Sequence, residues 1–506
     1  LSLEIPQEYG GLDVPKSVAA AVTEELAGAG GFGVTITAHT SIGTLPLVYF
    51  GTDEQKQRYL PRLASGDWIA AYALTEANSG SDALAARTRA TLSDDGSHYR
   101  LNGTKQFISN AGFADLFTVF AKVDGEQFSA FLVERSFPGV EFGEEEHKMG
   151  IKSSSTRQLV LNNAEVPAEN LLGEVGKGHR IAFNVLNIGR YKLGASSVGA
   201  AKLALAQSIE YALARSQFGR QIASFGLIQQ KLARMATQLY SAESAVYRTI
   251  GLIDTAIAEK TGADAVLAGI QEYLVECSIL KVLGTEMLDY VVDEGVQIHG
   301  GYGYLRDFPI ERAYRDSRIQ RIFEGTNEIN RLLIPGTLMR RALSGELPLI
   351  QAATRLRTEL FEPPAEIPDV PWGIELHQVA NLKKLALLLA GSAMERFGTE
   401  LEQEQEVLAA NANILIVAYA AESAVLRARR LGHDVGSQMA KLCLDTALDQ
   451  ALQQAVYALS RLSSGDDLRM LQSVARRLTR REPFDIVQAE RDVVKSVVEA
   501  RGYPTF

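Results

Sequence analysis

Hydrophobic residues recur at helical spacing in the first part of the chain. Ser17 to Ala27 carries an apolar side chain every three or four residues, and Thr52 precedes a second helical stretch, Glu54 to Leu60, as an N-cap residue would. Between them, Gly28 to Gly33 matches the pattern G-x-G-x-x-G. A dinucleotide-binding fingerprint needs a strand before it, whereas this run follows a helical pattern. We therefore interpret the glycine run as a connector within a helical domain of residues 1–68.

The pattern of polar and apolar residues changes after Trp68. Short alternating or β-rich runs follow one another as far as Pro167, and turn pairs such as Asn102-Gly103 separate them. Short strands with this punctuation are typical of a compact antiparallel barrel or sandwich, so residues 69–177 are predicted to form a small β domain. The predicted strands are Trp68–Leu74, Ala86–Leu92, Tyr99–Leu101, Leu116–Val123, Ser129–Glu134 and Gln158–Leu161.

Helical periodicity returns after Gly178. Long amphipathic patterns joined by short links predict an antiparallel bundle over residues 178–335. Its expected helices are Arg180–Arg215, Phe225–Lys260, Ala263–Leu288 and Val291–Ile298. Pro335-Gly336 is expected to interrupt the chain, and the prolines between Pro363 and Pro371 mark a linker within residues 336–375. Ala/Leu-rich helices follow over 376–506. The predicted fold is mainly α with a central β domain and an extra C-terminal helical domain.

Composition narrows the class of protein. Of 506 residues, 46% are apolar and 22% charged, with a formal net charge of −10. These values are normal for a folded protein and argue against a general nucleic-acid binder, which would be basic. Cys277 and Cys443 cannot build a disulfide framework, so we expect a reducing compartment. The apolar run Ile414–Ala421 is shorter than the roughly 20 residues of a membrane-spanning helix, so none is expected, and the scattered histidines predict no metal site.

Four segments combine small, hydroxyl, aromatic or cationic residues in places where a ligand could approach the backbone. Tyr72–Asp82 ends a strand with small and hydroxyl residues, although an ordinary turn explains it as well. Lys105–Asn110 puts a ring and a hydroxyl on a strand, or is one more strand with a core Phe. Arg215–Arg220 either complements a helix C-terminus or grips a pyrophosphate. Gln297–Gly303 ends a helix in more glycines than a C-cap needs.

The most informative segment for catalysis is Ile322–Ile329. Glu324 follows two large apolar residues and precedes Gly325, and a helix is expected to begin near Thr326. Acids are common at helix boundaries, and most are solvated. Partial burial, however, raises the pKa of a carboxyl group and lets the carboxylate act as a base. Glu324 is therefore the candidate base.

Taken in this order, the segments from Leu1 to about Leu333 resemble those of the acyl-CoA dehydrogenase family, most of all its very-long-chain branch. The resemblance implies a helical N-terminal domain, a small antiparallel β domain and a four-helix bundle, with FAD as cofactor, and in this branch an extra C-terminal helical domain. Members usually have further helices before the stretch that begins at Leu1, so the first domain is expected to be incomplete.

The resemblance also implies an activity. It is the α,β-dehydrogenation of long-chain acyl-CoA to trans-2-enoyl-CoA in fatty-acid β-oxidation, by a homodimer that passes electrons to an electron-transfer flavoprotein. An acyl-CoA oxidase that uses dioxygen, and a non-catalytic assembly protein on the same fold, are the alternatives. The chain-length preference rests on the branch and on the small residues Ser41–Thr44, which we expect at the floor of the acyl pocket.

Roles carry over to the matched residues as part of the resemblance. Glu324 would remove the α-proton while hydride passes to flavin N5. Acyl-CoA would contact Ser81, Ser154, Asn187, Arg190 and Glu324. FAD would contact Tyr72, Leu74, Thr75, Gly80, Ser81, Phe107, Ile108, Ser109, Arg215, Gln217, Phe218, Gln297, Gly300, Gly301, Gly325, Thr326 and Glu328. The family often has Trp where this chain has Phe107, a change that should alter the flavin environment without abolishing binding.

One segment bears on location. Met339–Phe361 mixes arginines with large apolar residues, and in the very-long-chain branch a segment near here meets the membrane surface. We favour a helix packed on its own protein over peripheral membrane contact. The expected location is the cytoplasm in a bacterium, or the matrix side of the mitochondrial membrane in a eukaryote.

Overall fold

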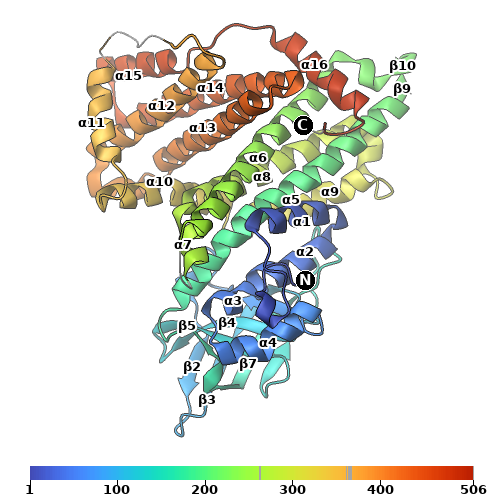
Figure 1. Cartoon of the computed structure of the whole chain (residues 1–506), viewed down its shortest axis with the longest axis vertical. Coiled ribbons are helices and arrows are strands. Elements are labelled where there is room, and N and C mark those ends of the chain that lie inside the picture. Colours follow the sequence, from blue (N-terminus) through green and yellow to red (C-terminus); the bar gives the residue numbers. More distant parts are fainter. Residues whose placement is uncertain (261–263, 361, 363–366, 505–506) are drawn as a thin grey trace. The chain divides into compact units, whose positions relative to one another are not determined.

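The computed structural model describes residues 1–260, 264–360, 362 and 367–504. The chain forms two compact units (Figure 1). The first contains Leu1–Gly199, Ile250–Cys277 and Arg315–Thr326. The second contains Ala200–Thr249, Ser278–Tyr314 and Asn327–Phe506.

The first unit opens with short helices, as predicted. They are α1 (Lys16–Leu26), α2 (Gly31–Ala38), α3 (Leu45–Phe50) and α4 (Asp53–Ser65). Thr52 begins α4 with a capping box, in which its side chain accepts from the Gln55 backbone N–H and the Gln55 side chain accepts from the Thr52 N–H. Gly28–Gly30 join α1 to α2, which confirms the connector for the first half of the glycine run, whereas Gly31–Gly33 form the start of α2. His39–Gly43 forms a turn of π-helix ahead of α3.

The β domain is one eight-stranded sheet in the order β6-β7-β3-β2-β4-β5-β8, with β1 beside β4. Most neighbours are antiparallel, while β1 and β2 each run parallel to β4. Buried residues such as Phe117, Val119 and Phe131 fill its core. The strands are β1 (Ala70–Ala73), β2 (Arg89–Leu92), β3 (His98–Ser109), β4 (Leu116–Val123), β5 (Gln127–Glu134), β6 (Val140–Phe142), β7 (Thr156–Pro167) and β8 (Leu171–Leu172).

The turn predicted at Asn102-Gly103 is wrong. Both residues lie inside β3, which pairs with β7 on either side of them, so each of these two strands extends over 12 residues. The pairing shifts register between Leu101 and Gly103, and this irregularity absorbs the glycine. An Asn-Gly pair favours a turn locally, but the ladder with β7 overrides that preference.

Long helices follow the β domain. They are α5 (Gly178–Ala214), α6 (Gly226–Ala258), α7 (Ala265–Glu272), α8 (Leu274–His299), α9 (Pro309–Ser317) and α10 (Asn327–Leu343). The predicted helix Ala263–Leu288, whose first residue lies outside the described residues, breaks instead at Tyr273, and α8 then runs on through Val291–Ile298. Pro335 does not interrupt the chain but lies inside α10. Burial of Ile334, Pro335 and Thr337 on one side of that helix offsets the lost backbone hydrogen bond.

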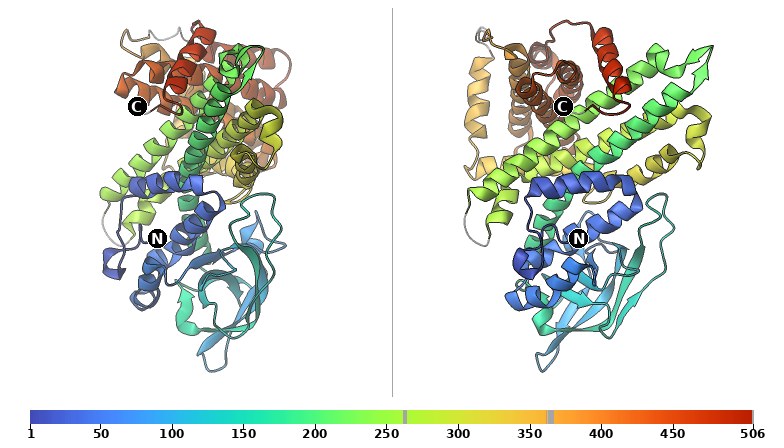
Figure 2. Two further views of the ribbon diagram at one scale, coloured as in Figure 1. Left: turned by 90° about the vertical axis from the view of Figure 1, so that its right-hand side faces the viewer. Right: turned by 45° about the vertical axis from the view of Figure 1, so that its right-hand side comes forward.

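The extra C-terminal helices are α11 (Leu349–Glu359), α12 (Gly373–Phe397), α13 (Gln405–Leu431), α14 (Asp434–Leu462), α15 (Gly465–Leu478) and α16 (Ile486–Glu499). α13 packs along α12 and α14 (Figure 2). Contrary to the expectation from Ile414–Ala421, α13 is long and apolar enough to cross a membrane. Length and composition are weak evidence, since 61% of its apolar window is buried in the structure, as in the core helix of a bundle.

The segment considered for membrane contact packs on its own protein. α11 buries Leu356 and forms ion pairs between Arg357 and Glu395 and between Glu359 and Lys384, both with α12. These contacts support the interpretation of a surface helix. Phe361 and the first linker prolines, Pro363 and Pro364, lie outside the described residues.

Candidate functional site

Glu324 lies on a strained turn. It follows the 3₁₀-helix Arg318–Arg321 and precedes α10, and its φ of 59° and the 82° of Gly325 are both left-handed. A non-glycine residue rarely adopts this conformation, and such strain tends to occur at functional sites. The Glu324 side chain is half-buried and its Oε2 is shielded from solvent. The partial burial that the flanking apolar residues predicted is therefore present.

The Glu324 carboxylate lies against the backbone of α5 at Gly189. A Cβ added to Gly189 would stand 2.7 Å from Oε2 and 2.8 Å from Cδ of Glu324, closer than real Cβ contacts come. Only a glycine at this position of α5 leaves the carboxylate where it is. The bare helix surface is thus one wall of the space that holds Glu324.

Arg190, the next residue of α5, holds the same turn. Its Nε donates to the Glu324 carbonyl at 3.3 Å, and its Nη1 donates to Asn187 Oδ1 at 2.9 Å. Burial lowers the pKa of the Arg190 guanidinium, and the neighbouring Glu324 carboxylate opposes that shift. Three predicted residues, Asn187, Arg190 and Glu324, are therefore brought together. Ser154 is buried in the loop before β7, where Lys148 Nζ donates to its carbonyl at 2.6 Å.

Tyr72 connects β1 to the part of α5 that lies against Glu324. Its hydroxyl donates to the Ala182 carbonyl of α5 at 3.5 Å, and its ring packs edge-on against Phe120 at 5.2 Å. Burial raises the pKa of Tyr72 well above its usual value, and the charge of Glu324 raises it further. Tyr72 therefore stays neutral and lies within electrostatic reach of Glu324.

The loop after β1 is tied to β3 by a buried ion pair. Lys105 Nζ donates to Glu76 Oε1 at 2.7 Å and to the Leu74 carbonyl at 3.2 Å, and the Gln106 N–H donates to the Thr75 carbonyl at 2.8 Å. Burial lowers the pKa of Lys105 to about 8, against the opposing effect of Glu76. Leu74 and Thr75 are thus held beside the strand that carries the predicted residues Phe107, Ile108 and Ser109.

Phe107 is not a core residue. The pairing of β3 with β7 shifts register between Lys105 and Ile108, and within this bulge Phe107 has a φ of 59° and is 59% exposed. Ile108 points into the core and Ser109 is half-buried. The bulge therefore re-aims one aromatic ring out of the sheet toward solvent. Gly80 and Ser81, at the end of the loop after β1, are also exposed.

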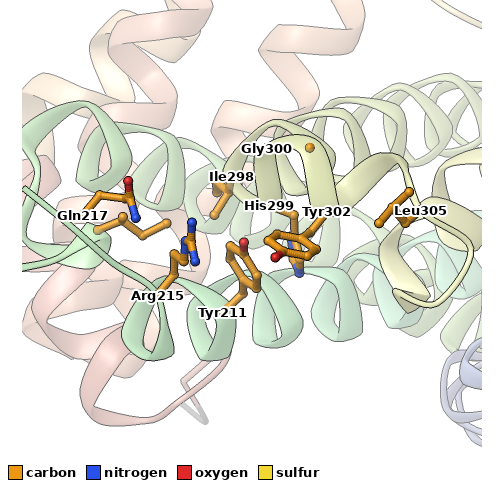
Figure 3. Close-up of a pocket in the computed structure, with 10 residues that line it drawn as sticks. Tyr211, Arg215, Gln217, Ile298, His299, Gly300, Tyr302 and Leu305 are labelled. Carbon is orange, nitrogen blue, oxygen red and sulfur yellow. The ribbon is translucent and has the colours of Figure 1, made fainter.

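A pocket of about 420 Å³ in the second unit gathers residues from the end of α5, the following hairpin and the end of α8 (Figure 3). It contains four of the predicted residues, Arg215, Gln217, Gly300 and Gly301. Phe218, 94% exposed on the β9–β10 hairpin (Ser216–Gln217 and Arg220–Gln221), and the exposed Gln297 do not line it. Its other lining residues are Tyr211, Ile222, Ile298, His299, Tyr302 and Leu305.

Aromatic rings and a cation face each other in this pocket. Tyr211 stacks on His299 with ring centroids 4.2 Å apart, and the Arg215 guanidinium lies 5.8 Å from the centre of the Tyr302 ring. His299 Nδ1 donates to the Gly295 carbonyl at 2.7 Å, and burial lowers the pKa of His299, so its ring is neutral. Flat rings beside a guanidinium suit a ligand with a planar base and an anionic group.

Models of one family match most of the chain. "Acyl-CoA dehydrogenase, N-terminal domain" matches residues 1–67, and the middle-domain model matches 71–164. Two models, both described as "Acyl-CoA dehydrogenase, C-terminal domain", match 176–339 and 381–477. The chain belongs to the acyl-CoA dehydrogenase family.

Similar proteins extend the match over nearly all of this acyl-CoA dehydrogenase. "Probable acyl-CoA dehydrogenase" of Bacillus subtilis (strain 168) is 49% identical over 99% of this chain and 87% of its own. The crystal structure of an acyl-CoA dehydrogenase from Bacillus anthracis, complexed with FAD, has a TM-score of 0.97 and 50% identity, covering 99% of this chain and 88% of that one. The mitochondrial very long-chain specific enzyme of Rattus norvegicus is 43% identical over 66% of this chain, but only half of that protein is covered.

Some residues of this acyl-CoA dehydrogenase's site were not predicted. Gly189 gave no signal, because nothing in the local pattern of α5 shows which distant side chain lies against it. Tyr211 could have been found, since it lies one turn before Arg215, the residue that follows α5 and whose N–H still donates to the Tyr211 carbonyl at 2.9 Å. Of the residues predicted around Glu324, Gly325 and Thr326 are half-buried in the turn itself, whereas Glu328 is exposed on α10.

Proposed function

We propose that this chain is an FAD-dependent dehydrogenase of long-chain acyl-CoA, in which Glu324 removes the α-proton and the product is trans-2-enoyl-CoA. Family membership supports acyl-CoA dehydrogenation in general. The observation that carries the specific role of Glu324 is its geometry. Its half-shielded carboxylate lies on a strained turn against the bare backbone of Gly189, and Arg190 holds that turn through the Glu324 carbonyl.

Two groups of residues fit FAD. In the second unit, an added Cβ at Gly300 or Gly301 would meet nothing within 4 Å, so bare backbone and the Arg215 guanidinium are available to a diphosphate. In the first unit, the loop Tyr72–Ser81 and the bulge at Phe107 present backbone and an aromatic ring, as a flavin ring requires. Bound FAD would supply the acceptor for the hydride that leaves the substrate β-carbon.

The residues of the chain would supply the proton chemistry. A thioester α-proton is too weakly acidic for a carboxylate in water, so charge that develops on the thioester oxygen must be stabilised as the proton leaves. We assign that role in part to the Glu324 backbone N–H. Binding of the acyl chain would expel water from around Glu324, which makes its carboxylate more basic. Arg190 would keep the Glu324 turn in place during the transfer.

The finer parts of the proposal rest on family likeness. The long-chain preference rests on similarity to the rat very long-chain specific enzyme and on Ser41–Thr44, of which all but the half-buried Ile42 are buried. The proposed electron acceptor is an electron-transfer flavoprotein, and the proposed assembly is a homodimer. The ion pairs between α11 and α12 favour a surface helix over membrane contact.

Anaerobic titration of the purified holoprotein tests the function. Palmitoyl-CoA should bleach the flavin absorption band, butyryl-CoA should do so more slowly, and palmitate without CoA should leave the band unchanged. In air, hydrogen peroxide formed in proportion to enoyl-CoA would instead identify an oxidase. A flavin spectrum that no acyl-CoA changes would refute the proposal and favour a non-catalytic assembly protein.

A further inference from the structure

The first residue of α10 is anchored to α8. Asn327 follows Glu324 by three residues and is 2% exposed. Its Nδ2 donates to Glu286 Oε1 at 3.0 Å, and its Oδ1 accepts from Lys281 Nζ at 2.6 Å. The chain that leaves the Glu324 turn is therefore fixed to α8 by buried polar contacts.

The same contacts continue into the extra helical domain. Arg331, one turn after Asn327 on α10, makes a two-pronged pair with Glu286 at 2.8 and 2.7 Å. Its Nε donates to Asn413 Oδ1 of α13 at 2.7 Å, and Asn413 Nδ2 donates to Gln454 Oε1 of α14 at 3.0 Å. We call the path Asn327–Glu286–Arg331–Asn413–Gln454 the α10 relay. A planar guanidinium suits its centre, because it presents donors in a fixed fork.

Side-chain packing beside the relay is incomplete. A cavity of about 830 Å³ is lined by residues of α6, α8, α13 and α14, and Glu286, Arg331, Asn413 and Gln454 are part of its wall. Atoms that face a cavity have no packing partners on that side. The relay runs along this wall, so its hydrogen bonds join α8, α10, α13 and α14 beside a space that side chains do not fill. The side chains of Arg331 and Glu286 are 17% and 41% exposed, so their charge-assisted bonds are partly shielded from solvent.

We propose that Arg331 is a positioning residue, through which the extra C-terminal helical domain fixes the turn that carries Glu324. The inference rests on the proposed function of Glu324. Asn327 transmits the effect, because a displacement of the first turn of α10 moves the residues immediately before it. Misplacement of a catalytic group by about 1 Å can slow a reaction by about 10²-fold, so a modest loosening of this turn has a measurable cost. The role assigned to the extra domain is thus mechanical support of catalysis.

Substitution of Arg331 by Met tests this, because Met keeps an unbranched apolar stem and removes the donors. We expect Arg331→Met to slow flavin reduction by palmitoyl-CoA about 10-fold in anaerobic rapid mixing, with FAD content and KM for palmitoyl-CoA unchanged. Arg331→Lys should not rescue the rate, because an ammonium cannot make the forked pair. Asn413→Ala should slow flavin reduction less, and the double variant should be no slower than Arg331→Met alone.

Arg461→Met is the matched control. Arg461 makes an equally forked pair with Glu404 at 2.8 and 2.6 Å within the extra domain, away from the relay. The Arg461→Met substitution should leave the rate of flavin reduction unchanged. A rate for Arg331→Met within twofold of wild type, or an equal loss in Arg461→Met, would overturn the inference. If Arg331→Met does not yield folded holoprotein, a wild-type rate in Asn413→Ala overturns it equally. Failure of the proposed function can be told apart from failure of this inference, because palmitoyl-CoA would then not bleach the flavin of the wild-type protein either.

Discussion

Substitution of Gly189 by Ala should lower the activity of the protein while leaving its stability almost unchanged. Gly189→Ala adds a Cβ 2.7 Å from Oε2, 2.8 Å from Cδ and 3.0 Å from Oε1 of Glu324, whereas ordinary contact begins near 3.4 Å. The carboxylate must therefore retreat by about 0.7 Å. Because these three atoms end a side chain, the rotation costs little stability, and Ala is a better helix former than Gly by roughly 0.5–1 kcal/mol. We expect the free energy of unfolding to change by less than about 1 kcal/mol.

The effect on the reaction should be much larger. A displacement of a base by about 1 Å costs about 10²-fold in rate, so the Gly189→Ala displacement predicts a loss of roughly 10- to 100-fold in the rate of flavin reduction by palmitoyl-CoA. Anaerobic rapid mixing measures that rate, and chemical denaturation measures the free energy of unfolding. FAD content should be unchanged.

Gly251→Ala is the control, because Gly251 is also a helical glycine and an added Cβ meets no atom within 4 Å. Its rate of flavin reduction should stay within about twofold of wild type, as expected for a surface substitution. A Gly189→Ala variant that reduces its flavin as fast as wild type would show that the Glu324 carboxylate does not work from the place where the structure puts it.

Three further predictions concern other parts of the molecule. Burial alone would raise the pKa of the Glu4 carboxyl, but the charges of Lys16 and Lys192 outweigh this effect and lower the pKa from 4.5 to about 2. The stability that the ionised Glu4 contributes is therefore complete above pH 4.5 and is lost as the pH falls toward 2. Glu4→Gln should therefore destabilise the protein by about 3–5 kcal/mol at pH 7. The free energy of unfolding, measured by denaturation at each pH, should also fall less steeply below pH 4.5 in Glu4→Gln than in wild type. Arg215→Gln should weaken FAD binding about 10- to 100-fold, measured by reconstitution of apoprotein, with no change in thermal stability. Phe107→Trp should shift the visible flavin spectrum while kcat changes less than about threefold, and an identical spectrum would mean that Phe107 is not beside the flavin.

The order and type of the main elements follow from periodicity, because long amphipathic runs have no other way to bury their apolar faces. The errors occur where tertiary packing overrides a local signal. Asn102-Gly103 reads as a turn but is carried inside β3 by pairing with β7, and Pro335 is held inside α10 by burial of its neighbours. The break at Tyr273 gave no proline or glycine signal.

The candidate site could be predicted only in part. Resemblance to a family selects Glu324, Arg190 and Arg215 by their motifs, and the structure shows which of these have partners. Gly189 and the exposed ring of Phe107 depend on contacts and on a bulge that sequence spacing does not encode. The α10 relay likewise joins residues from α8, α10, α13 and α14 whose separation along the chain hides their contact.

The most direct test of whether Glu324 removes the proton is to compare wild type, a Glu324 variant and a control variant in one assay. Glu324→Gln keeps the shape of the side chain and removes the base, and Glu25→Gln, at an exposed position of α1, is its control. Mixed anaerobically with palmitoyl-CoA, wild type and Glu25→Gln should reduce their flavin at the same rate. Glu324→Gln, with full FAD content, should bind palmitoyl-CoA and stay oxidised. Reduction of its flavin at the wild-type rate would mean that another group takes the proton.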